Sequence, residues 1–395
     1  MKKLKILRII TRLNIGGPAI HAALLTKEFN NGEFESRLLC GRISEKEGDM
    51  GYVARDYGVD PIYISSLRRE ISPFSDIAAF FRIAFVMLRI RPDIVHTHTA
   101  KAGTLGRIAA VLTGVPVKIH TFHGNVFQGY FKTSEARFFM FTERLLAKFT
   151  DAIIAISPSQ KKDIVEKYRI TEEKKCHVIQ LGFDLQKFLN PGQKRKAFRE
   201  KYKLKDNDIF VGIIGRLVPI KNHKMFIDAV YHMNKNATEN LADRMKFAII
   251  GDGYMKEEVL AYSKFRGLAD KILCIGWARD IDEVYAGLDI VALTSINEGT
   301  PVSLIEAMSS EKPVVSTDVG GVKDALGEAG ILVKSEDYKR LGVEISLLAA
   351  SPEKREKLGR LGRDFVKTRF SKERLVSELK ELYKDLMSKK RGTKA

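Results

Sequence analysis

The segment DIVALTSINEGTPVSLIEAMSSEKPVVST, residues 289–317, contains a strand–helix–strand pattern and two glutamates. The apolar runs at its two ends are typical of strands, and Pro301 fits the first position of the helix between them, where its missing N–H is harmless. Three apolar residues then recur at the spacing of a buried helical stripe: Leu304, Ile305 and Met308. Glu298 therefore precedes the helix, and Glu306 lies about a turn and a half inside it.

The two glutamates flank backbone N–H groups that can bind an anion. The helical part from Pro301 to Glu306 covers roughly 7–8 Å at about 1.5 Å per residue. This spacing suits a ligand with two separated polyhydroxy ends and an anion between them. The alternative is a carboxylate that caps the helix together with an unrelated surface glutamate, and the spacing alone leaves both interpretations open.

Similar apolar runs alternate with helical patterns through most of the 395 residues. Ten are predicted as strands: LKILRII, ESRLLC, PDIVHTH, VKIHTF and DAIIAIS, then IFVGIIG, MKFAII, KILCIG, DIVALTS and KPVVST. Most are continuously apolar, which is typical of parallel strands covered on both faces. Because helical segments separate them, we expect an α/β fold with two doubly wound, Rossmann-like domains facing a central cleft at the carboxyl ends of their strands.

A Pro-Gly pair and a charge run separate the two strand series, in FLNPGQKRKAFREKYKLKDND at 188–208. We therefore place the first domain at 1–190 and the second at 205–371. Beyond 336 the chain reads as helical. Four leucines share one face of its last segment: Leu375, Leu379, Leu382 and Leu386.

The cysteines and the apolar runs argue against disulfides and membrane spans. Three cysteines lie far apart inside apolar segments: Cys40, Cys176 and Cys274. We expect buried, reduced thiols in a cytoplasmic protein, with no CxxC pair for metal or redox chemistry.

The N-terminal apolar run is too short for a signal peptide. The longest apolar helical pattern, 77–90, is interrupted by Arg82 and Arg89 and is too short to span a bilayer.

The formal net charge of +18 indicates an anionic partner. Residues 61–150 hold 12 basic and 5 acidic side chains, so the excess is concentrated there. Such a field attracts nucleic acid, anionic lipid or a phosphorylated ligand, and charge alone does not choose among them.

Glycines and basic residues at other predicted strand ends suit phosphate binding. Gly-Gly-Pro at 16–18 ends the first strand and opens a helix whose N–H groups and positive dipole end can meet an anion; a plain tight turn is the alternative. Arg216 and Lys221 flank a loop leading to a helix from about 221, as a diphosphate clamp or a solvated basic loop. GDG at 251–253 and GWARDIDEVY at 276–285 follow the next two strands, as a nucleoside pocket requires. The first of these strand ends is not GxGxxG, which disfavours a dinucleotide site, and no GxxxxGK[ST] occurs anywhere in the sequence.

Four histidines follow two strands in HTHTAKAG and HTFHG: His96, His98, His120 and His123. A metal site is disfavoured because no carboxylate or cysteine accompanies them at ligand spacing. Strand alternation predicts one buried histidine and one at the cleft mouth in each pair. His123, which precedes Gly124, is expected to be the most exposed and to contact substrate. No nucleophile elbow or Ser-His-Asp pattern is visible.

Several of these motifs occur in the order of a known family. The run GRLVPIKN, GDG, IGWARDIDEVYAGLDIVALTSINEGTPVSLIEAMSSEKPVVSTDVGGVKDAL resembles the retaining glycosyltransferases of family 4, which have the GT-B fold. LNIGGPAIH, PDIVHTHTAKAG and HTFHGNVFQGYF resemble the acceptor-side half of bacterial members that build surface polysaccharides or lipid-linked glycans. The resemblance covers nearly the whole chain and implies that the last helix, about 372–390, crosses back onto the first domain.

The resemblance implies transfer of a sugar from a nucleotide diphosphate donor, here expected to be a UDP-sugar, with retained anomeric configuration and neither a metal nor a cofactor. Arg216 and Lys221 would hold the diphosphate and stabilise the leaving group in place of a metal ion. Glu306 would bind the ribose hydroxyls, and Glu298 would contact the donor sugar. Front-face attack, with the departing phosphate taking the acceptor proton, fits the missing nucleophile.

Backbone groups and one histidine would supply the remaining donor contacts. Four loop residues would lie beside the sugar: Gly299, Thr300, Pro301 and Val302. Three residues would line the nucleoside: Gly251, Arg279 and Ile281. Gly16 and Gly17 would meet the phosphate from the first domain, and His123 would bond the sugar or position the acceptor. Thr300 stands where many relatives have a bulkier apolar residue, so the sugar's identity does not carry over.

Half of the 22 phenylalanines fall within 74–149, the basic region. In SEARFFMFTERLLAKF, four residues share one helical face: Arg137, Phe141, Arg144 and Lys148. Arg/Phe surfaces suit an anionic membrane interface, and buried helices with snorkelling arginines are the alternative. We favour a peripheral enzyme at the inner face of the cytoplasmic membrane with a lipid-linked or glycan acceptor. A soluble transferase for a small polar acceptor comes second, and nucleic-acid binding is disfavoured because no known binding module is present.

Overall fold

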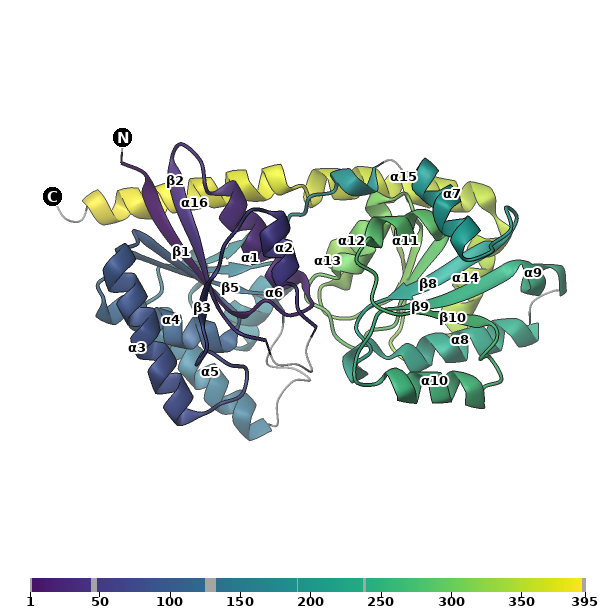
Figure 1. The fold of residues 1–395 in the computed structure, drawn as a ribbon, viewed down its shortest axis with the longest axis horizontal. Coiled ribbons are helices and arrows are strands. Elements are labelled where there is room, and N and C mark those ends of the chain that lie inside the picture. The colour runs from purple at the N-terminus through teal and green to yellow at the C-terminus, as the bar shows by residue number, and fades with distance from the viewer. Residues whose placement is uncertain (1, 44–47, 125–132, 190, 237–238, 393–395) are drawn as a thin grey trace. The chain divides into compact units, whose positions relative to one another are not determined.

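The computed structural model describes residues 2–43, 48–124, 133–189, 191–236 and 239–392 (Figure 1). These residues form two compact units, the first made of Met1–Phe183 with Lys372–Ala395 and the second of Asp184–Ser371. Each unit is built on a parallel sheet flanked by helices. The α/β, doubly wound fold class predicted from the continuously apolar runs is confirmed.

The first unit has the strand order β3-β2-β1-β4-β5-β6-β7, with every pair parallel. Its strands are β1 (Leu4–Arg12), β2 (Phe34–Gly41), β3 (Ile62–Ile64), β4 (Ile94–His98), β5 (Val117–Phe122), β6 (Ala152–Ala155) and β7 (Cys176–Val178). Its helices are α1 (Gly17–Glu28), α2 (Gly51–Asp56), α3 (Pro73–Ile90), α4 (Ala100–Leu112), α5 (Thr133–Lys148), α6 (Pro158–Lys162) and α16 (Lys372–Gly392).

The second unit has the strand order β10-β9-β8-β11-β12-β13, again all parallel. Its strands are β8 (Ile209–Ile214), β9 (Met245–Ile250), β10 (Ile272–Ile275), β11 (Ile290–Leu293), β12 (Val314–Thr317) and β13 (Ile331–Val333). Its helices are α7 (Gly192–Lys201), α8 (His223–Asn236), α9 (Glu239–Arg244), α10 (Lys256–Phe265), α11 (Ile281–Gly287), α12 (Val302–Ser309), α13 (Val322–Leu326), α14 (Tyr338–Ala350) and α15 (Pro352–Arg369).

All ten predicted strands form, and three further strands were not predicted. β3, β7 and β13 are three residues long and lie at sheet edges. A three-residue run is too short to show a hydrophobic period, and an edge strand pairs on one side only, so the local sequence carries little signal for it.

The two faces of the first sheet are covered by different helices. On β1, Ile6 packs toward α1 and α16, whereas Leu7 and Ile9 pack toward α3 and α4. This alternation follows from the period of two along a strand. Because both faces are covered, the strand is apolar at consecutive positions, which is the pattern that identified it.

The segment expected to separate the two domains belongs to the second unit. Within 188–208, residues of α7 bind the loop before β11: Arg195 Nη2 donates to Asp289 at 2.6 Å, and Arg199 Nη1 donates to the same carboxylate at 3.2 Å. The division lies earlier, between Phe183 and Asp184. The charge run therefore forms a helix held by ion pairs, not a solvated linker.

The last helix, α16, belongs to the first unit, as the resemblance implied. The four leucines predicted to share a face are all buried: Leu375, Leu379, Leu382 and Leu386. Tyr383 accepts a hydrogen bond from the buried Arg8 Nη1 at 2.9 Å, and its hydroxyl lies 2.6 Å from His96 Nδ1. The helix is therefore fixed by apolar burial and by one buried polar network.

The cysteine prediction is wrong at one of its three positions. Cys40 and Cys176 are buried, whereas Cys274 is exposed because it lies on β10, an edge strand with little cover. Burial raises the pKa of the Cys40 thiol to about 12 and that of Cys176 to about 11, so neither thiol ionises near neutral pH.

Among the helices of the described residues, none has the length and apolar character needed to cross a bilayer.

Candidate functional site

In the second unit, the loop after β8 and the loop after β11 are adjacent because these strands pair in parallel. The Ile296 N–H donates to the Ile220 carbonyl at 2.9 Å. Thr294 Oγ1 donates to the carbonyls of Lys221 at 3.0 Å and Asn222 at 2.9 Å. Backbone bonds thus fix the segment that carries Lys221 beside the segment that leads to the first glutamate.

Lys221 and Glu298 form an ion pair, with Nζ 2.5 Å from Oε1. Ser295 Oγ donates to the same oxygen at 2.6 Å. Within the described part of the chain, Glu298 Oε2 has no partner, so one oxygen of this carboxylate is anchored and the other can accept a hydroxyl. An ammonium has three donors, so Lys221 keeps two for a further anion. The residues assigned to the diphosphate and to the sugar are therefore in direct contact.

The helix predicted from about 221 is α8, and Lys221 lies just before it. Lys221 ends a 3₁₀ turn, Pro219–Lys221, and α8 begins two residues later at His223. Asn222 between them has a φ of +46°, in the left-handed region, which interrupts the helix.

Arg216 lies in the loop after β8, which the loop after β9 supports. The Leu217 N–H donates to the Asp252 carbonyl at 2.9 Å. Gly251 has a φ of +138°, and a Cβ there would lie 2.0 Å from the Gly215 carbonyl oxygen. Only glycine permits this approach, so Gly251 shapes the Arg216 loop. Among the residues the structure describes, the half-buried Arg216 guanidinium has no partner, which leaves its donors available to an anion.

Helix α12 begins at Val302, one residue later than predicted, because Pro301 retains a ψ of 94°. Glu306 is therefore about one turn inside the helix, not a turn and a half. The N–H groups of Val302 and Ser303, which begin α12, have no intrahelical acceptor, and Pro301 separates them from Gly299 and Thr300. The predicted apolar stripe is confirmed, since three residues are completely buried: Leu304, Ile305 and Met308.

Glu306 accepts a hydrogen bond from the buried Tyr285 hydroxyl, which lies 3.0 Å from Oε2. Burial raises the pKa of the Glu306 carboxyl to about 7, although Lys187 and the bond from Tyr285 favour its charged form. The carboxyl therefore titrates near neutral pH, and a ligand that donates hydrogen bonds to it would favour ionisation.

The segment predicted to line a nucleoside includes Tyr285, which donates a hydrogen bond to Glu306. Arg279 is exposed, and Ile281 is the first residue of α11, the helix that carries Tyr285. Trp277, the only tryptophan, is 44% exposed in the same segment.

The loop after β12 supports Glu298, and its residues were not assigned a site role from the sequence. Thr317 Oγ1 donates to the Ser295 carbonyl at 2.6 Å, and the Gly321 N–H donates to the Glu298 carbonyl at 3.0 Å. Gly320 has a φ of +54°, and a Cβ there would lie 2.0 Å from the Glu298 carbonyl oxygen. The Gly-Gly pair in the sequence was the available signal for this close approach.

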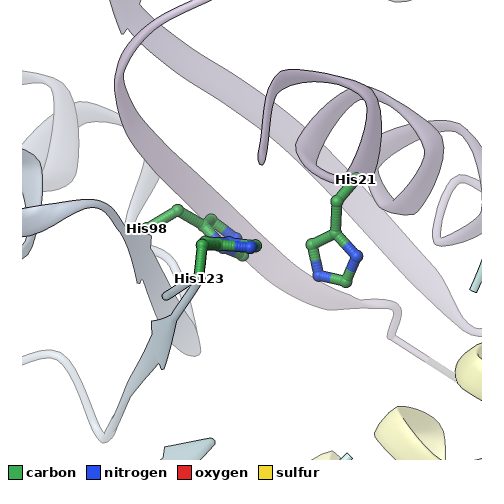
Figure 2. A group of neighbouring side chains, drawn as sticks. All are labelled: His21, His98 and His123. Atoms are coloured by element: carbon green, nitrogen blue, oxygen red, sulfur yellow. The ribbon is translucent and has the colours of Figure 1, made fainter. Parts of the chain in front are cut away.

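In the first unit, Gly17 begins α1 and Gly16 precedes it with a φ of +153°. Three histidines lie close to this end of the sheet: His21 in α1, His98 at the end of β4 and His123 just after β5 (Figure 2). They gather because β1, β4 and β5 are consecutive in the sheet. His98 Nδ1 lies 2.9 Å from His123 Nε2, and the His21 ring meets the His123 ring edge-on with centroids 5.1 Å apart.

The predicted exposure of the histidines is correct for His120 and His123 and wrong for the other pair. His120 is buried and His123 partly exposed, but His96 and His98 are both fully buried because β4 is central in the sheet. Burial lowers the pKa of His98 well below its usual value and that of His123 to about 3. Both rings are therefore neutral at pH 7, and one donates to the other.

The contribution of His21 was missed because it lies on a helix, far in sequence from the strand-end motifs. Ring nitrogens of His21, His98 and His123 lie within 4.8 Å of one another, a set that could hold a metal ion. Zn–N distances of about 2.0–2.1 Å separate tetrahedral ligands by about 3.3 Å. The 2.9 Å between His98 and His123 fits a hydrogen bond better than two ligands of one ion.

Two family models match the chain, one over most of each unit. Residues 15–187 match "Glycosyltransferase Family 4", and residues 194–365 match "Glycosyl transferases group 1". The UDP-Gal:alpha-D-GlcNAc-diphosphoundecaprenol alpha-1,3-galactosyltransferase of Escherichia coli is 32% identical over 293 residues, which is 74% of this chain and 73% of that protein. The capsular polysaccharide biosynthesis glycosyltransferase CapM of Staphylococcus aureus is 27% identical over 87% of this chain and 90% of its own.

Solved structures share the fold at low sequence identity. HepE of Anabaena, crystallised in complex with UDP, has a TM-score of 0.79 at 18% identity, over 97% of this chain and 100% of its own. Sucrose-phosphate synthase of Thermosynechococcus elongatus has a TM-score of 0.80 at 16% identity, over 97% of this chain and 99% of its own. These neighbours identify the fold as GT-B.

Proposed function

We propose that this chain, which belongs to the family 4 glycosyltransferases, transfers a sugar from a UDP-sugar to a lipid-linked glycan acceptor, with retention and without a metal ion. The observation that carries the proposal is the contact of Lys221 with Glu298, between the loop that holds Arg216 and the first turn of α12. These groups supply cations for a diphosphate and carboxylates for hydroxyls within one unit.

The diphosphate would bind Arg216 and Lys221. The guanidinium is unpaired among the described residues, and the ammonium retains two donors beyond its bond to Glu298. Two cations and the N–H groups that begin α12 can offset the charge that develops on a leaving phosphate. This is the physical basis for proposing that no metal ion is required.

The sugar and the ribose would bind at opposite ends of the segment from Glu298 to Glu306. Glu298 Oε2 is oriented by the two bonds on Oε1 and, having no partner among the described residues, would accept a sugar hydroxyl. Glu306 lies about one turn inside α12 and would accept the ribose hydroxyls, which would add hydrogen bonds to the one that its carboxylate receives from Tyr285. UDP is favoured because HepE was crystallised with UDP and the E. coli relative is named for UDP-Gal.

Retention would follow from attack on the face that the diphosphate leaves, with a phosphate oxygen taking the acceptor proton. In this scheme the protein orients groups and stabilises charge. Gly16 and Gly17 would offer N–H groups from the first unit, and His123, a neutral ring held by His98, would bond the sugar or the acceptor.

The acceptor is assigned from the relatives, two of which are named for diphosphoundecaprenol substrates, from E. coli and Campylobacter jejuni. An enzyme for such an acceptor would work at the inner, anionic face of the cytoplasmic membrane as a peripheral protein. A soluble transferase for a small polar acceptor remains the second candidate.

The test is transfer of radiolabelled sugar from a panel of UDP-sugars to a synthetic sugar-diphosphate-polyprenol, followed by determination of the anomeric configuration. We expect one UDP-sugar to be used, an α-linked product from an α-linked donor, and full turnover in excess EDTA. Loss of turnover in EDTA with rescue by a divalent cation would contradict metal independence. Turnover only with water-soluble acceptors would favour the second candidate.

A further inference from the structure

We propose that the outer faces of helices α3, α4 and α5 form one docking surface for an anionic lipid bilayer, called here the α3–α5 face. The link between this face and the acceptor rests on the proposed function. Binding of the face to lipid requires neither donor nor acceptor. The α3–α5 face is the surface of the first unit that would meet the membrane.

Helix α3 carries an apolar stripe on the side opposite its buried face. Five large side chains are exposed: Phe74 (88%), Ile77 (56%), Phe81 (64%), Phe85 (63%) and Leu88 (60%). At about 100° per residue they fall within an arc of about 80°. The buried positions, Ala79, Ile83 and Met87, are centred on the other side of the helix. The helix thus has one apolar face against the core and a second apolar face toward solvent, which a core helix does not need.

The neighbouring helices α4 and α5 also expose large apolar side chains. α4 packs against α3 on one side and α5 on the other, and the three helices lie next to one another in Figure 1. α4 exposes Ile108, Val111 and Leu112. α5 and the residue after it expose Phe141, Leu145 and Phe149. Half of the large apolar side chains that are exposed in the described part of the chain therefore lie on this face.

The charges on the same face select an anionic partner. Arg82 and Arg89 lie beside the α3 stripe, and Arg137 and Lys148 lie beside Phe141; all four are exposed. None of the four side chains has a carboxylate partner among the residues described.

The carboxylates of these helices are already engaged, among those whose side chains are described. Asp76 pairs with Lys101 at 2.6 Å, and the buried Glu143 pairs with Arg107 at 2.7 Å. Aromatic side chains with unpaired cations at their edge match the interface of an anionic leaflet. A second copy using the same face would place cations against cations, which argues against self-association there.

The experiment is flotation of the full chain at low salt with vesicles of phosphatidylcholine alone or mixed with phosphatidylglycerol. We compare wild type, Phe81→Ser/Phe85→Ser and a matched control, Phe265→Ser, which alters a 79% exposed phenylalanine on α10 of the second unit. We expect binding to mixed vesicles only, at least about tenfold weaker for the double variant and unchanged for the control. The altered side chains are exposed, so thermal unfolding should stay the same.

The outcomes separate the alternatives. No flotation of the wild type, or equal flotation of wild type and double variant, would overturn the proposal. A wild-type dimer in sedimentation that the double variant dissociates, with flotation unchanged, would assign the face to self-association and also overturn it. If the wild type floats and the double variant does not, but neither transfers sugar, the docking face stands and the proposed function fails.

Discussion

Replacing Glu306 by glutamine should stabilise the second unit and weaken the UDP binding that we propose for it. Burial raises the carboxyl pKa from 4.5 to about 7, and Tyr285 donates to it at 3.0 Å. Glutamine has the same shape, can accept the Tyr285 bond and carries no charge. The variant therefore removes only the cost of holding a carboxylate in a buried site.

The magnitude and its pH dependence follow from the two pKa values. Below pH 4.5 the carboxyl is protonated in the folded and the unfolded chain, so it contributes no difference in stability. Between pH 4.5 and about 7 the unfolded chain loses the proton first, and the penalty to the folded state grows. Above pH 7 it is constant at about 3 kcal/mol, or somewhat less because the side chain is only half-buried by accessible area. Glu306→Gln should thus raise the stability at pH 8 and hardly change it near pH 4.5.

The assay is thermal unfolding followed by the fluorescence of Trp277, the only tryptophan, which lies in the same unit. At about 2–4 °C per kcal/mol, we expect the variant to melt roughly 5–10 °C higher than wild type at pH 8. The control is Glu283→Gln, which neutralises an exposed carboxylate on the adjacent α11 and should shift the midpoint little.

Calorimetric titration with UDP supplies the second half of the test. Loss of a charge-assisted bond to the ribose costs about 1.5–3 kcal/mol, which weakens binding roughly 10- to 150-fold. In the wild type, affinity should rise from pH 5.5 to 7.5 more steeply than in the variant, since ribose binding favours the ionised carboxylate. A variant that melts lower than wild type at pH 8, or that binds UDP equally well, would refute the reasoning.

Substitutions at three further residues test the rest of the site. Lys221→Ala should lower turnover by about 10²- to 10³-fold without preventing folding, and near-normal turnover would contradict its role at the leaving group. His98→Ala removes the hydrogen bond that orients His123; we expect kcat to fall about tenfold, His98→Gln to recover part of it, and UDP affinity to stay unchanged. Gly320→Ala places a Cβ 2.0 Å from the Glu298 carbonyl oxygen, so turnover and melting temperature should both fall, and a variant normal in both would show that the loop relaxes.

Local patterns were sufficient for the secondary structure that forms the scaffold. Ten strands follow from continuously apolar runs, and the buried stripe of α12 follows from a 3–4 spacing. The errors lie where a local pattern has two physical outcomes. A charge run can be a linker or a helix held by ion pairs. Here it forms a helix, in which Arg199 pairs with Asp289.

The site depended on contacts that no local pattern records. Lys221 and Glu298 are 77 positions apart, and they meet because β11 joins the sheet beside β8 while β9 and β10 lie on the other side. His21 joins His98 and His123 for a similar reason, since β4 pairs with β1. Strand order is a property of the whole sheet, so the sequence motifs predicted separate roles and left their contacts undetermined.

By itself, the sequence determined the fold class, the family and the types of residue at each strand end, because hydrophobic period and motif order are read along the chain. Only the tertiary structure decided that one oxygen of Glu298 is anchored, and that a second apolar face of α3 is exposed among the described residues. Both depend on which groups become neighbours on folding. Burial and hydrogen bonding are set by those neighbours in space, and distance along the chain does not fix them.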